Sequence, residues 1–168
     1  MFSKFDHIAG AISVRLKRYF LKSTGKPDLS YITQKLFVGG HCSIHTLWKS
    51  NIKAIVDLRM EAEDDRRDLE KYDIEYLHLS IQDRSIPSTT DVNQAIDWIR
   101  TKLEKDQNVF IHCNLGRGRA PLIACAYMIY NGMSNEEAIK LVKAKRKVTY
   151  FNKRQLSWLA ELSLQNNL

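Results

Sequence analysis

The chain has 168 residues, 44% of them hydrophobic and 27% charged, which suits one compact domain with a single core. Its three cysteines (Cys42, Cys113 and Cys125) show no paired spacing, which argues against a disulfide framework and favours a reducing, cytoplasmic compartment. The formal net charge of +7 favours anionic partners, although many soluble proteins without such partners are also basic.

Residues 1–29 differ in pattern from the rest of the chain. Apolar residues recur every three or four positions and predict an amphipathic helix; they are Phe2, Phe5, Ile8, Ile12, Leu16 and Tyr19. Basic residues accompany them, against the single acid Asp6 before Lys26. Three interpretations stay open: a helix packed on the domain, a basic helix on a membrane surface, and a cleaved transit peptide. No stretch approaches the ~18 consecutive apolar residues of a transmembrane helix.

Residues 30–168 alternate between strand-like and helix-like stretches. In chain order we predict a strand at 35–38 with a Gly39-Gly40 turn, a helix at 43–50, a strand at 52–58, a charged helix at 61–71 and a strand at 74–79. A loop, a helix at 88–103, a strand at 109–111, a helix at 119–131, a capping-box helix start at 134–137 and a last helix at 152–164 follow. This order predicts an α/β fold: a single domain with a central, mostly parallel sheet flanked by helices.

The most informative stretch is His112-Cys113-Asn114-Leu115-Gly116-Arg117-Gly118-Arg119, between the fourth strand and the following helix. A loop that enters a helix N-terminus offers backbone N–H groups and the positive end of the helix dipole. These favour a thiolate at Cys113, and they can also bind the oxygens of a phosphate. Gly116 and Gly118 give the backbone the freedom to turn its N–H groups inward. The planar fork of Arg119 can hold two phosphate oxygens.

This stretch resembles the signature of the protein tyrosine phosphatase superfamily: His-Cys, five residues, then Arg, with Gly third among the five. Residues 32–40 and 52–58 resemble the opening of the compact dual-specificity branch, so the resemblance covers about residues 31–162. It implies a catalytic domain at residues 30–168 with a phosphate-binding loop between a strand and a helix. It also implies a cysteine-dependent phosphatase that forms a phosphocysteine at Cys113 and needs no cofactor and no metal.

The same resemblance implies an aspartate about thirty residues before the cysteine, which protonates the leaving oxygen and then acts as base on water. Asp83 matches this position, and Asp57 and Asp91 are the alternatives nearby in sequence. We expect His112 to hydrogen-bond to the backbone of the loop and so favour the thiolate. The catalytic residues expected are Cys113, Arg119 and Asp83. The expected substrate-binding residues are His112, Asn114, Leu115, Gly116, Arg117, Gly118 and Arg84.

The chain departs from the family after the arginine, where a serine or threonine usually stabilises the departing thiolate. Here the residue is Ala120, followed by Pro121. The missing hydroxyl leaves two alternatives to an efficient enzyme: slow turnover, or a phosphate-binding protein without useful catalysis.

The substrate is less clearly indicated. Arg117 is a second cation inside the loop, where related phosphoinositide phosphatases carry a lysine, and Arg84 adds a further cation beside the expected acid. Residues 143–147 form a basic patch that a solvated helix face or a nuclear-import-like run also explains. We favour a phosphorylated protein as substrate. A phosphoinositide or other anionic phospholipid is the alternative, with membrane contact through the N-terminal helix, and nucleic acid is disfavoured.

Overall fold

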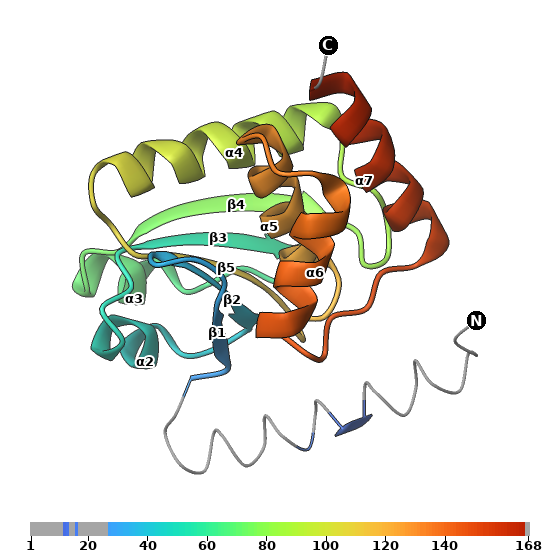
Figure 1. Ribbon diagram of the computed structural model, residues 1–168. Coiled ribbons are helices and arrows are strands. Elements are labelled where there is room, and N and C mark those ends of the chain that lie inside the picture. Colours follow the sequence, from blue (N-terminus) through green and yellow to red (C-terminus); the bar gives the residue numbers. More distant parts are fainter. Residues whose placement is uncertain (1–11, 14–15, 17–26, 167–168) are drawn as a thin grey trace.

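A five-stranded sheet forms the centre of the computed structural model, which describes residues 12–13, 16 and 27–166 (Figure 1). The strands follow one another in the order β1-β2-β5-β3-β4, and β1 is antiparallel to β2 whereas the other neighbours are parallel. Their bounds are Leu29–Tyr31 (β1), Leu36–Gly40 (β2), Ala54–Arg59 (β3), Glu75–Ile81 (β4) and Val109–Cys113 (β5). The predicted α/β fold with a mostly parallel sheet is therefore confirmed.

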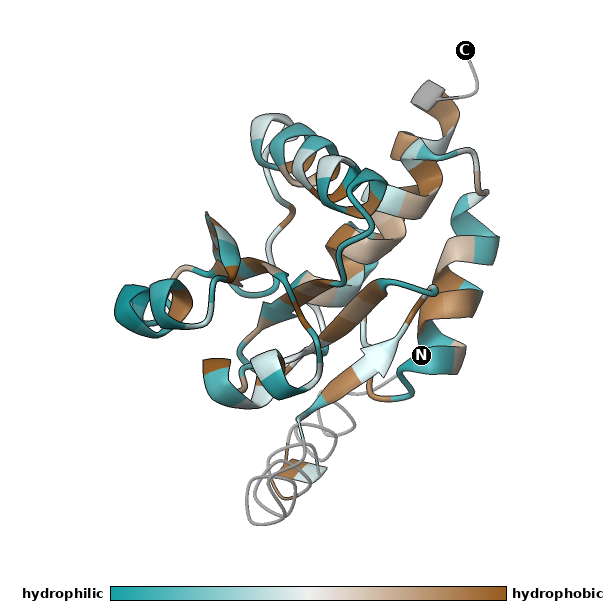
Figure 2. Cartoon of the chain, turned by 90° about the vertical axis from the view of Figure 1, so that its left-hand side faces the viewer, coloured by the Kyte–Doolittle hydropathy of each residue, from teal (hydrophilic) through white to brown (hydrophobic). Residues whose placement is uncertain are grey.

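Helices cover both faces of the sheet, and each face has its own apolar cluster (Figure 1). The smaller cluster lies under α2 (Ile44–Lys49) and α3 (Arg66–Lys71). The larger cluster lies under α4 (Thr89–Glu104), α5 (Arg119–Tyr130), α6 (Asn135–Lys145) and α7 (Lys153–Asn166). Hydrophobic residues lie on the strands and on the inner sides of the helices, and hydrophilic residues lie outside (Figure 2). Among the described residues, no helix is long and apolar enough to cross a bilayer.

Helix starts follow the capping residues that the sequence shows. The hydroxyl oxygens of Ser43, Ser88 and Ser134 accept hydrogen bonds from the first turns of α2, α4 and α6. The predicted capping box from Ser134 to Glu137 is present in both directions. Helix α5 is almost wholly buried, and it follows β5, which is buried along its whole length. This central strand and helix therefore give the connecting loop a rigid frame.

Two predictions about elements were wrong, and one strand was missed. The sequence predicts a helix over residues 61–71, but α3 begins only at Arg66, because the side chain of Asp65 caps it and the preceding residues form a loop. Gly39 and Gly40 lie inside β2 rather than in a turn, because both pair with β5. A Cβ at Gly39 would collide with the backbone oxygen of Asp28 and the ring of Phe110, so close packing explains this glycine. Strand β1 was missed because three residues show no alternation.

The N-terminal segment of residues 1–29 lies mostly outside the described residues, and its predicted basic helix stays a prediction. Within it, residues 12–13 and 16 are helical and exposed, and β1 begins at Leu29.

Candidate active site

A cavity of about 470 Å³ opens where β5 ends and α5 begins. Its walls come from the loop after β5, from the loops after β3 and β4, and from the segment before α7. The lining residues are Glu61, Asp83, Arg84, Cys113, Asn114, Leu115, Arg117, Gly118, Arg119, Tyr150, Asn152 and Gln155. Most of the expected site residues therefore meet in one cavity at the carboxyl ends of the parallel strands, where open α/β sheets bind ligands.

The loop of residues 113–119 is held from outside through its carbonyl oxygens. The oxygen of Asn114 accepts from the backbone N–H of His41 at 3.1 Å, and that of Arg117 accepts from the N–H of Tyr150 at 2.8 Å. In a planar trans peptide the C=O and N–H bonds point in opposite directions, so the N–H groups that follow face away from these anchors. Gly116 has a φ of 61°, as expected for a glycine in this loop, whereas Gly118 has a φ of −119°.

The guanidinium of Arg119 is buried, with only 3% exposure, and Glu61 holds its terminal edge. Nη1 and Nη2 of Arg119 each donate to a Glu61 carboxylate oxygen at 2.7 Å. The Nε atom has no hydrogen-bond partner among the described residues and lies 3.4 Å from Oδ1 of Asp83. The Nε–Nη2 edge of the fork is therefore the edge that can bind two phosphate oxygens.

Electrostatics keep both partners of this pair charged. The hydrogen bond from Arg119 lowers the pKa of Glu61 to about 2. Burial lowers the pKa of Arg119, but the charges of Glu61, Cys113 and Asp83 outweigh burial and raise it. Glu61 is therefore ionised at neutral pH, and it makes a poor proton donor. Its depressed pKa favours folding above about pH 4.5, and this contribution is lost as the pH falls towards 2.

The three aspartates that the sequence offers as general acids lie in different places. Asp83 lines the cavity, and its side chain is 66% exposed. Asp57 is fully buried in an ion pair with Arg59, and Asp91 accepts a hydrogen bond from Ser88 in the first turn of α4. Neither Asp57 nor Asp91 is among the lining residues. The position of Asp83 therefore supports it as the candidate general acid.

The two additional arginines of the expected site also lie in the cavity wall. Nε of Arg117 donates to the backbone oxygen of Val148 at 3.2 Å, and its guanidinium lies 5.9 Å from the ring centre of Tyr150. Burial lowers the pKa of Arg117, and the charge of Arg84 lowers it further against an opposing effect of Tyr150. The two arginines therefore add positive charge to the cavity that Cys113 lines.

The thiols differ in their surroundings. All three cysteines are free, so no disulfide is formed. Cys113 lines the cavity, and Cys42, two residues after β2, is half-buried. Burial raises the pKa of Cys125 to about 12, which keeps this thiol protonated and inert at neutral pH.

Comparison with known proteins gives a family. A family model described as "Dual specificity phosphatase, catalytic domain" matches residues 36–165, which is more than half of the chain. The chain belongs to the dual-specificity phosphatase family. The resemblance of the signature loop therefore extends over nearly the whole described domain.

Individual relatives are distant. Protein tyrosine phosphatase type IVA 2 of Mus musculus is 31% identical over 97 residues, which cover 56% of this chain and 58% of the mouse protein, less than two thirds of its length. Dual specificity protein phosphatase 1B of Arabidopsis thaliana is 29% identical over 150 residues, which cover 85% of this chain and 87% of that protein. The crystal structure of PTPMT1 in complex with PI(5)P shares the fold with a TM-score of 0.76 at 20% identity, over 83% of this chain and 97% of that one.

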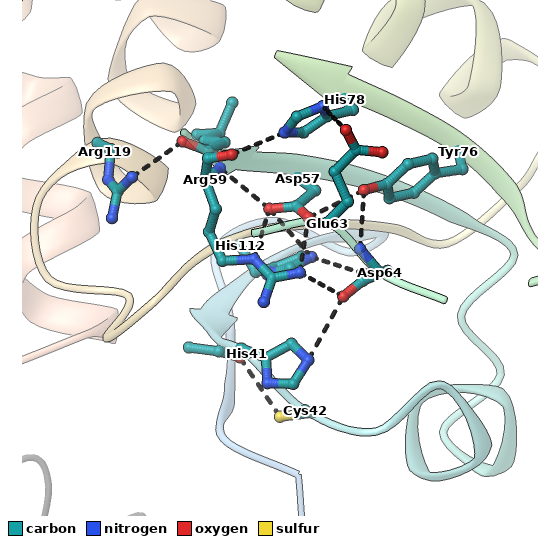
Figure 3. Close-up of polar contacts among 12 residues, drawn as sticks. His41, Cys42, Asp57, Arg59, Glu63, Asp64, Tyr76, His78, His112 and Arg119 are labelled. Atoms are coloured by element: carbon teal, nitrogen blue, oxygen red, sulfur yellow. Dashed lines mark hydrogen bonds and ion pairs between the residues drawn. The ribbon is translucent and has the colours of Figure 1, made fainter. Parts of the chain in front are cut away.

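His112 does not behave as expected in this dual-specificity phosphatase domain. We expected its ring to bond to the loop backbone, but its Nε2 lies 2.9 Å from Oδ2 of Asp64, and its Nδ1 has no partner among the described residues (Figure 3). The ring is fully buried and is not among the lining residues of the cavity. His112 therefore connects the loop to a carboxylate behind it.

Behind His112 lies a network of buried charges (Figure 3). Arg59 donates to Asp57 at 2.9 and 2.7 Å and to Asp64 at 2.6 Å. The hydroxyl of Tyr76 donates to Asp57 at 2.9 Å and accepts from the N–H of Asp64 at 3.1 Å. Side-chain ligand atoms of Asp57, Asp64 and His112 lie within 4.8 Å of one another, as in a metal site. However, the guanidinium of Arg59 already supplies the cation that both carboxylates need.

Replacing Asp64 with asparagine is expected to destabilise the domain by about 3 kcal/mol at pH 7, because a buried ion pair loses one partner. Burial alone would raise the pKa of Asp64, but the hydrogen bonds with His112 and His41 and the charge of Arg59 lower it. A depressed carboxyl pKa stabilises the fold above the unfolded value near 3.8 and less as the pH falls below it. The measurement is the free energy of urea unfolding of wild type and Asp64→Asn as a function of pH. The difference between the two proteins should become smaller below about pH 4, and a difference that does not change with pH would contradict this role of Asp64.

Sequence reasoning missed Glu61, Asp64 and Asn152. The first two lie in a charged run that looks like a solvated helix. Asn152 Nδ2 donates to the backbone oxygen of Arg84 at 2.9 Å, and Gln155 Nε2 donates to that of Ser85 at 3.1 Å, so the start of α7 holds the loop that carries Asp83. The spacing of Asn152 and Gln155 is a helix-capping signal that could have indicated a fixed helix start, but it could not have shown which loop the amides bind.

Proposed function

We propose that this domain is a cysteine-dependent phosphatase that hydrolyses phosphate monoesters on tyrosine, serine or threonine residues of proteins. The observation that carries the proposal is that Cys113, Asp83 and Arg119 meet in one cavity, and that Nε of Arg119 has no hydrogen-bond partner among the described residues. The volume of about 470 Å³ is large enough for a phosphorylated side chain.

In the first step, the Cys113 thiolate attacks phosphorus and forms a sulfur–phosphorus bond, and the bond from phosphorus to the ester oxygen breaks. Asp83 gives its proton to the leaving oxygen. The Nε–Nη2 edge of Arg119 and the N–H groups of the loop stabilise the charge on the other phosphate oxygens. Glu61 keeps the guanidinium in place during this step, since it holds the terminal Nη1–Nη2 edge.

In the second step, water attacks the phosphorus of the phosphocysteine and the sulfur–phosphorus bond breaks. Asp83, now ionised, accepts a proton from the water, and Cys113 leaves as a thiolate. The products are inorganic phosphate and the free enzyme. Ala120 is fully buried in the first turn of α5, so no hydroxyl from that position can stabilise the departing thiolate.

Replacing Ala120 with serine is expected to speed this second step. A hydrogen bond to a charged group contributes about 1.5–3 kcal/mol, or roughly 10- to 150-fold in rate. The wild-type protein should therefore show a burst of aryl alcohol followed by a slower steady rate in rapid mixing. Ala120→Ser should raise the steady rate and diminish the burst. If neither protein shows a burst and the steady rates are equal, position 120 has no effect on turnover.

The test of the main proposal is a phosphate-release panel. It should contain phosphotyrosine, phosphoserine and phosphothreonine peptides, soluble phosphoinositides, phosphoinositides in vesicles and an RNA 5′-phosphate. Highest kcat/KM on the peptides supports the proposal. Tight phosphate binding without release from any of these substrates would instead support a phosphate-binding protein without useful catalysis.

A phosphoinositide or other anionic phospholipid is the second candidate substrate. Arg84 and Arg117 line the cavity beside Cys113, where they could meet a second anionic group on the same molecule. The fold neighbour PTPMT1 was crystallised with PI(5)P, which is a phosphoinositide. The basic pattern of residues 1–26 would suit contact of a cytoplasmic protein with an anionic membrane surface.

The two candidates separate through Arg117 and the N-terminal segment. For a membrane phosphoinositide, Arg117→Ala should lower activity on inositide vesicles more than activity on a small aryl phosphate. Deletion of residues 1–26 should also lower activity on vesicles more than activity on the aryl phosphate, because it removes the membrane contact and leaves the reaction site unchanged. Phosphopeptide activity that exceeds vesicle activity, and that the deletion leaves unchanged, would favour the protein substrate.

A further inference from the structure

Arg146 is buried, although it belongs to the basic run of residues 143–147. Its exposure is 3%, whereas Lys143, Lys145 and Lys147 are exposed. The interpretation of this run as a surface patch therefore holds for the lysines and is wrong for the arginine. A buried guanidinium is costly unless its donors are hydrogen-bonded and its charge is paired.

Five hydrogen bonds surround the guanidinium, which matches the number of N–H donors that an arginine has. Nη1 and Nη2 donate to the two carboxylate oxygens of Asp28 at 3.1 and 3.0 Å, and Nη1 also donates to Oγ of Ser30 at 3.2 Å. Nη2 donates to the backbone oxygen of Leu115 at 3.2 Å, and Nε donates to that of Gly116. Two donors thus meet the Asp28 carboxylate, one meets Ser30 on β1, and two meet the phosphate-binding loop.

These contacts determine how two peptide groups of the loop are oriented. Because the Leu115 and Gly116 carbonyls point at Arg146, the N–H groups of Gly116 and Arg117 point away from it. The carbonyls of Asn114 and Arg117 on either side are anchored by backbone N–H groups. Four consecutive carbonyls are therefore held from outside, and a single side chain holds the middle two. A Cβ at Gly116 would collide with Arg146, which shows how closely the loop packs on it.

Asp28 fixes Arg146 in turn. The backbone N–H of Asp28 donates to Sγ of Cys42 at 3.1 Å, and its backbone oxygen accepts from the N–H of Gly40 at 3.2 Å. Gly40 is the β2 residue paired with Cys113 on β5. Asp28 is 8% exposed, its backbone is held against β2, and its carboxylate neutralises the buried cation.

We propose that Arg146 is a positioning residue of the phosphate-binding loop and that Asp28 acts through it. The arginine orients the N–H groups of residues 116 and 117 towards the phosphate. A lysine could not replace it, because all five donors of the guanidinium are used. The inference rests on the proposed phosphatase function, but its prediction concerns oxyanion binding and does not need turnover.

The test is calorimetric titration of the full chain with tungstate, an unreactive oxyanion, for wild type, Arg146→Lys, Asp28→Asn and the double variant. Lysine keeps the charge, but its three donors cannot replace five. A hydrogen bond to a charged group contributes roughly 10- to 150-fold in affinity, so the misdirected N–H groups in Arg146→Lys should weaken tungstate binding by at least about tenfold. Asp28→Asn should weaken it less, and the double variant should resemble Arg146→Lys, because both act through one group.

The matched control is Lys102→Met, which removes a similarly buried cation from its ion pair with Glu75 between α4 and β4, away from the cavity. Thermal melting of each variant measures the general loss of stability. The inference is supported if the three single variants lose similar amounts of melting temperature, but only Arg146→Lys and Asp28→Asn lose tungstate affinity.

Unchanged tungstate affinity in folded Arg146→Lys would overturn it, and so would an equal loss in Lys102→Met. If Arg146→Lys does not fold, the tungstate affinity of Asp28→Asn, which keeps the shape of the side chain, is the test: a reduced affinity supports the inference and an unchanged affinity overturns it. If wild type binds tungstate but releases no phosphate from any substrate, the proposed function is wrong. The tungstate affinities of the variants would still test the role of Arg146.

Discussion

Replacing Cys113 with serine is expected to abolish hydrolysis of an aryl phosphate while phosphate binding survives. A serine hydroxyl in this cavity stays protonated at neutral pH, so no nucleophile forms, whereas the loop N–H groups and Arg119 are unchanged. Steady-state release of the aryl alcohol measures the first effect, and calorimetric titration with phosphate measures the second. Turnover above a few per cent of wild type would remove Cys113 from the mechanism.

The matched control for this experiment is Cys42→Ser. Cys42 is a half-buried thiol outside the lining of the cavity, and a hydroxyl can take over its hydrogen bonds with Asp28 and Gly40. We expect this variant to keep wild-type turnover. Alkylation at pH 7 should likewise modify Cys113 and spare Cys125, because burial raises the pKa of Cys125 to about 12.

Replacing Asp83 with asparagine is expected to lower kcat by roughly 10²–10⁴-fold for alkyl phosphates, the usual size of a general-acid contribution. The loss should be smaller for activated aryl phosphates, whose leaving groups need little protonation. The measurement is a series of kcat values for substrates whose leaving groups differ in pKa. Equal losses across the series would point to a structural role for Asp83.

Asp91→Asn is the matched control for the general acid. Asp91 lies eight residues further along the chain, in the first turn of α4, and accepts a hydrogen bond from Ser88 at 2.6 Å. Because it does not line the cavity, its loss should leave kcat unchanged for every leaving group. A leaving-group-dependent loss in Asp91→Asn would move the role of acid away from Asp83.

Local signals in the sequence were sufficient for the loop and for most elements. The nucleophile, the glycine at φ 61° and Arg119 lie within eight consecutive residues, so their spacing fixes their relation whatever the rest of the chain does. Helix starts at Ser43, Ser88 and Ser134 were predictable for the same reason, since a cap and its helix are neighbours in sequence. The alternation of apolar strands and helices was enough for the α/β class.

Charged residues were the weak point of the sequence analysis. Glu61, Asp64 and Arg146 lie in charged runs, and a charged run is usually solvated, so the prediction placed all three at the surface. In the structure Asp64 and Arg146 are buried and Glu61 is held against Arg119. Arg119 and Asp28 come from distant segments, whereas Asp64 pairs with the nearby Arg59 and with the distant His112.

Residue order alone was enough to predict the fold class, the signature loop with Cys113 and Arg119, and Asp83 as the candidate acid. The folded domain was needed to show which edge of Arg119 is left for a ligand, which carboxylate meets His112 and what holds the loop. The reason is the distance along the chain: Arg146 and Asp28 are 118 residues apart, Arg119 and Glu61 are 58 apart, and His112 and Asp64 are 48 apart. No periodicity or spacing links such residues, since burial and charge pairing between them exist only once the sheet has brought its strands together.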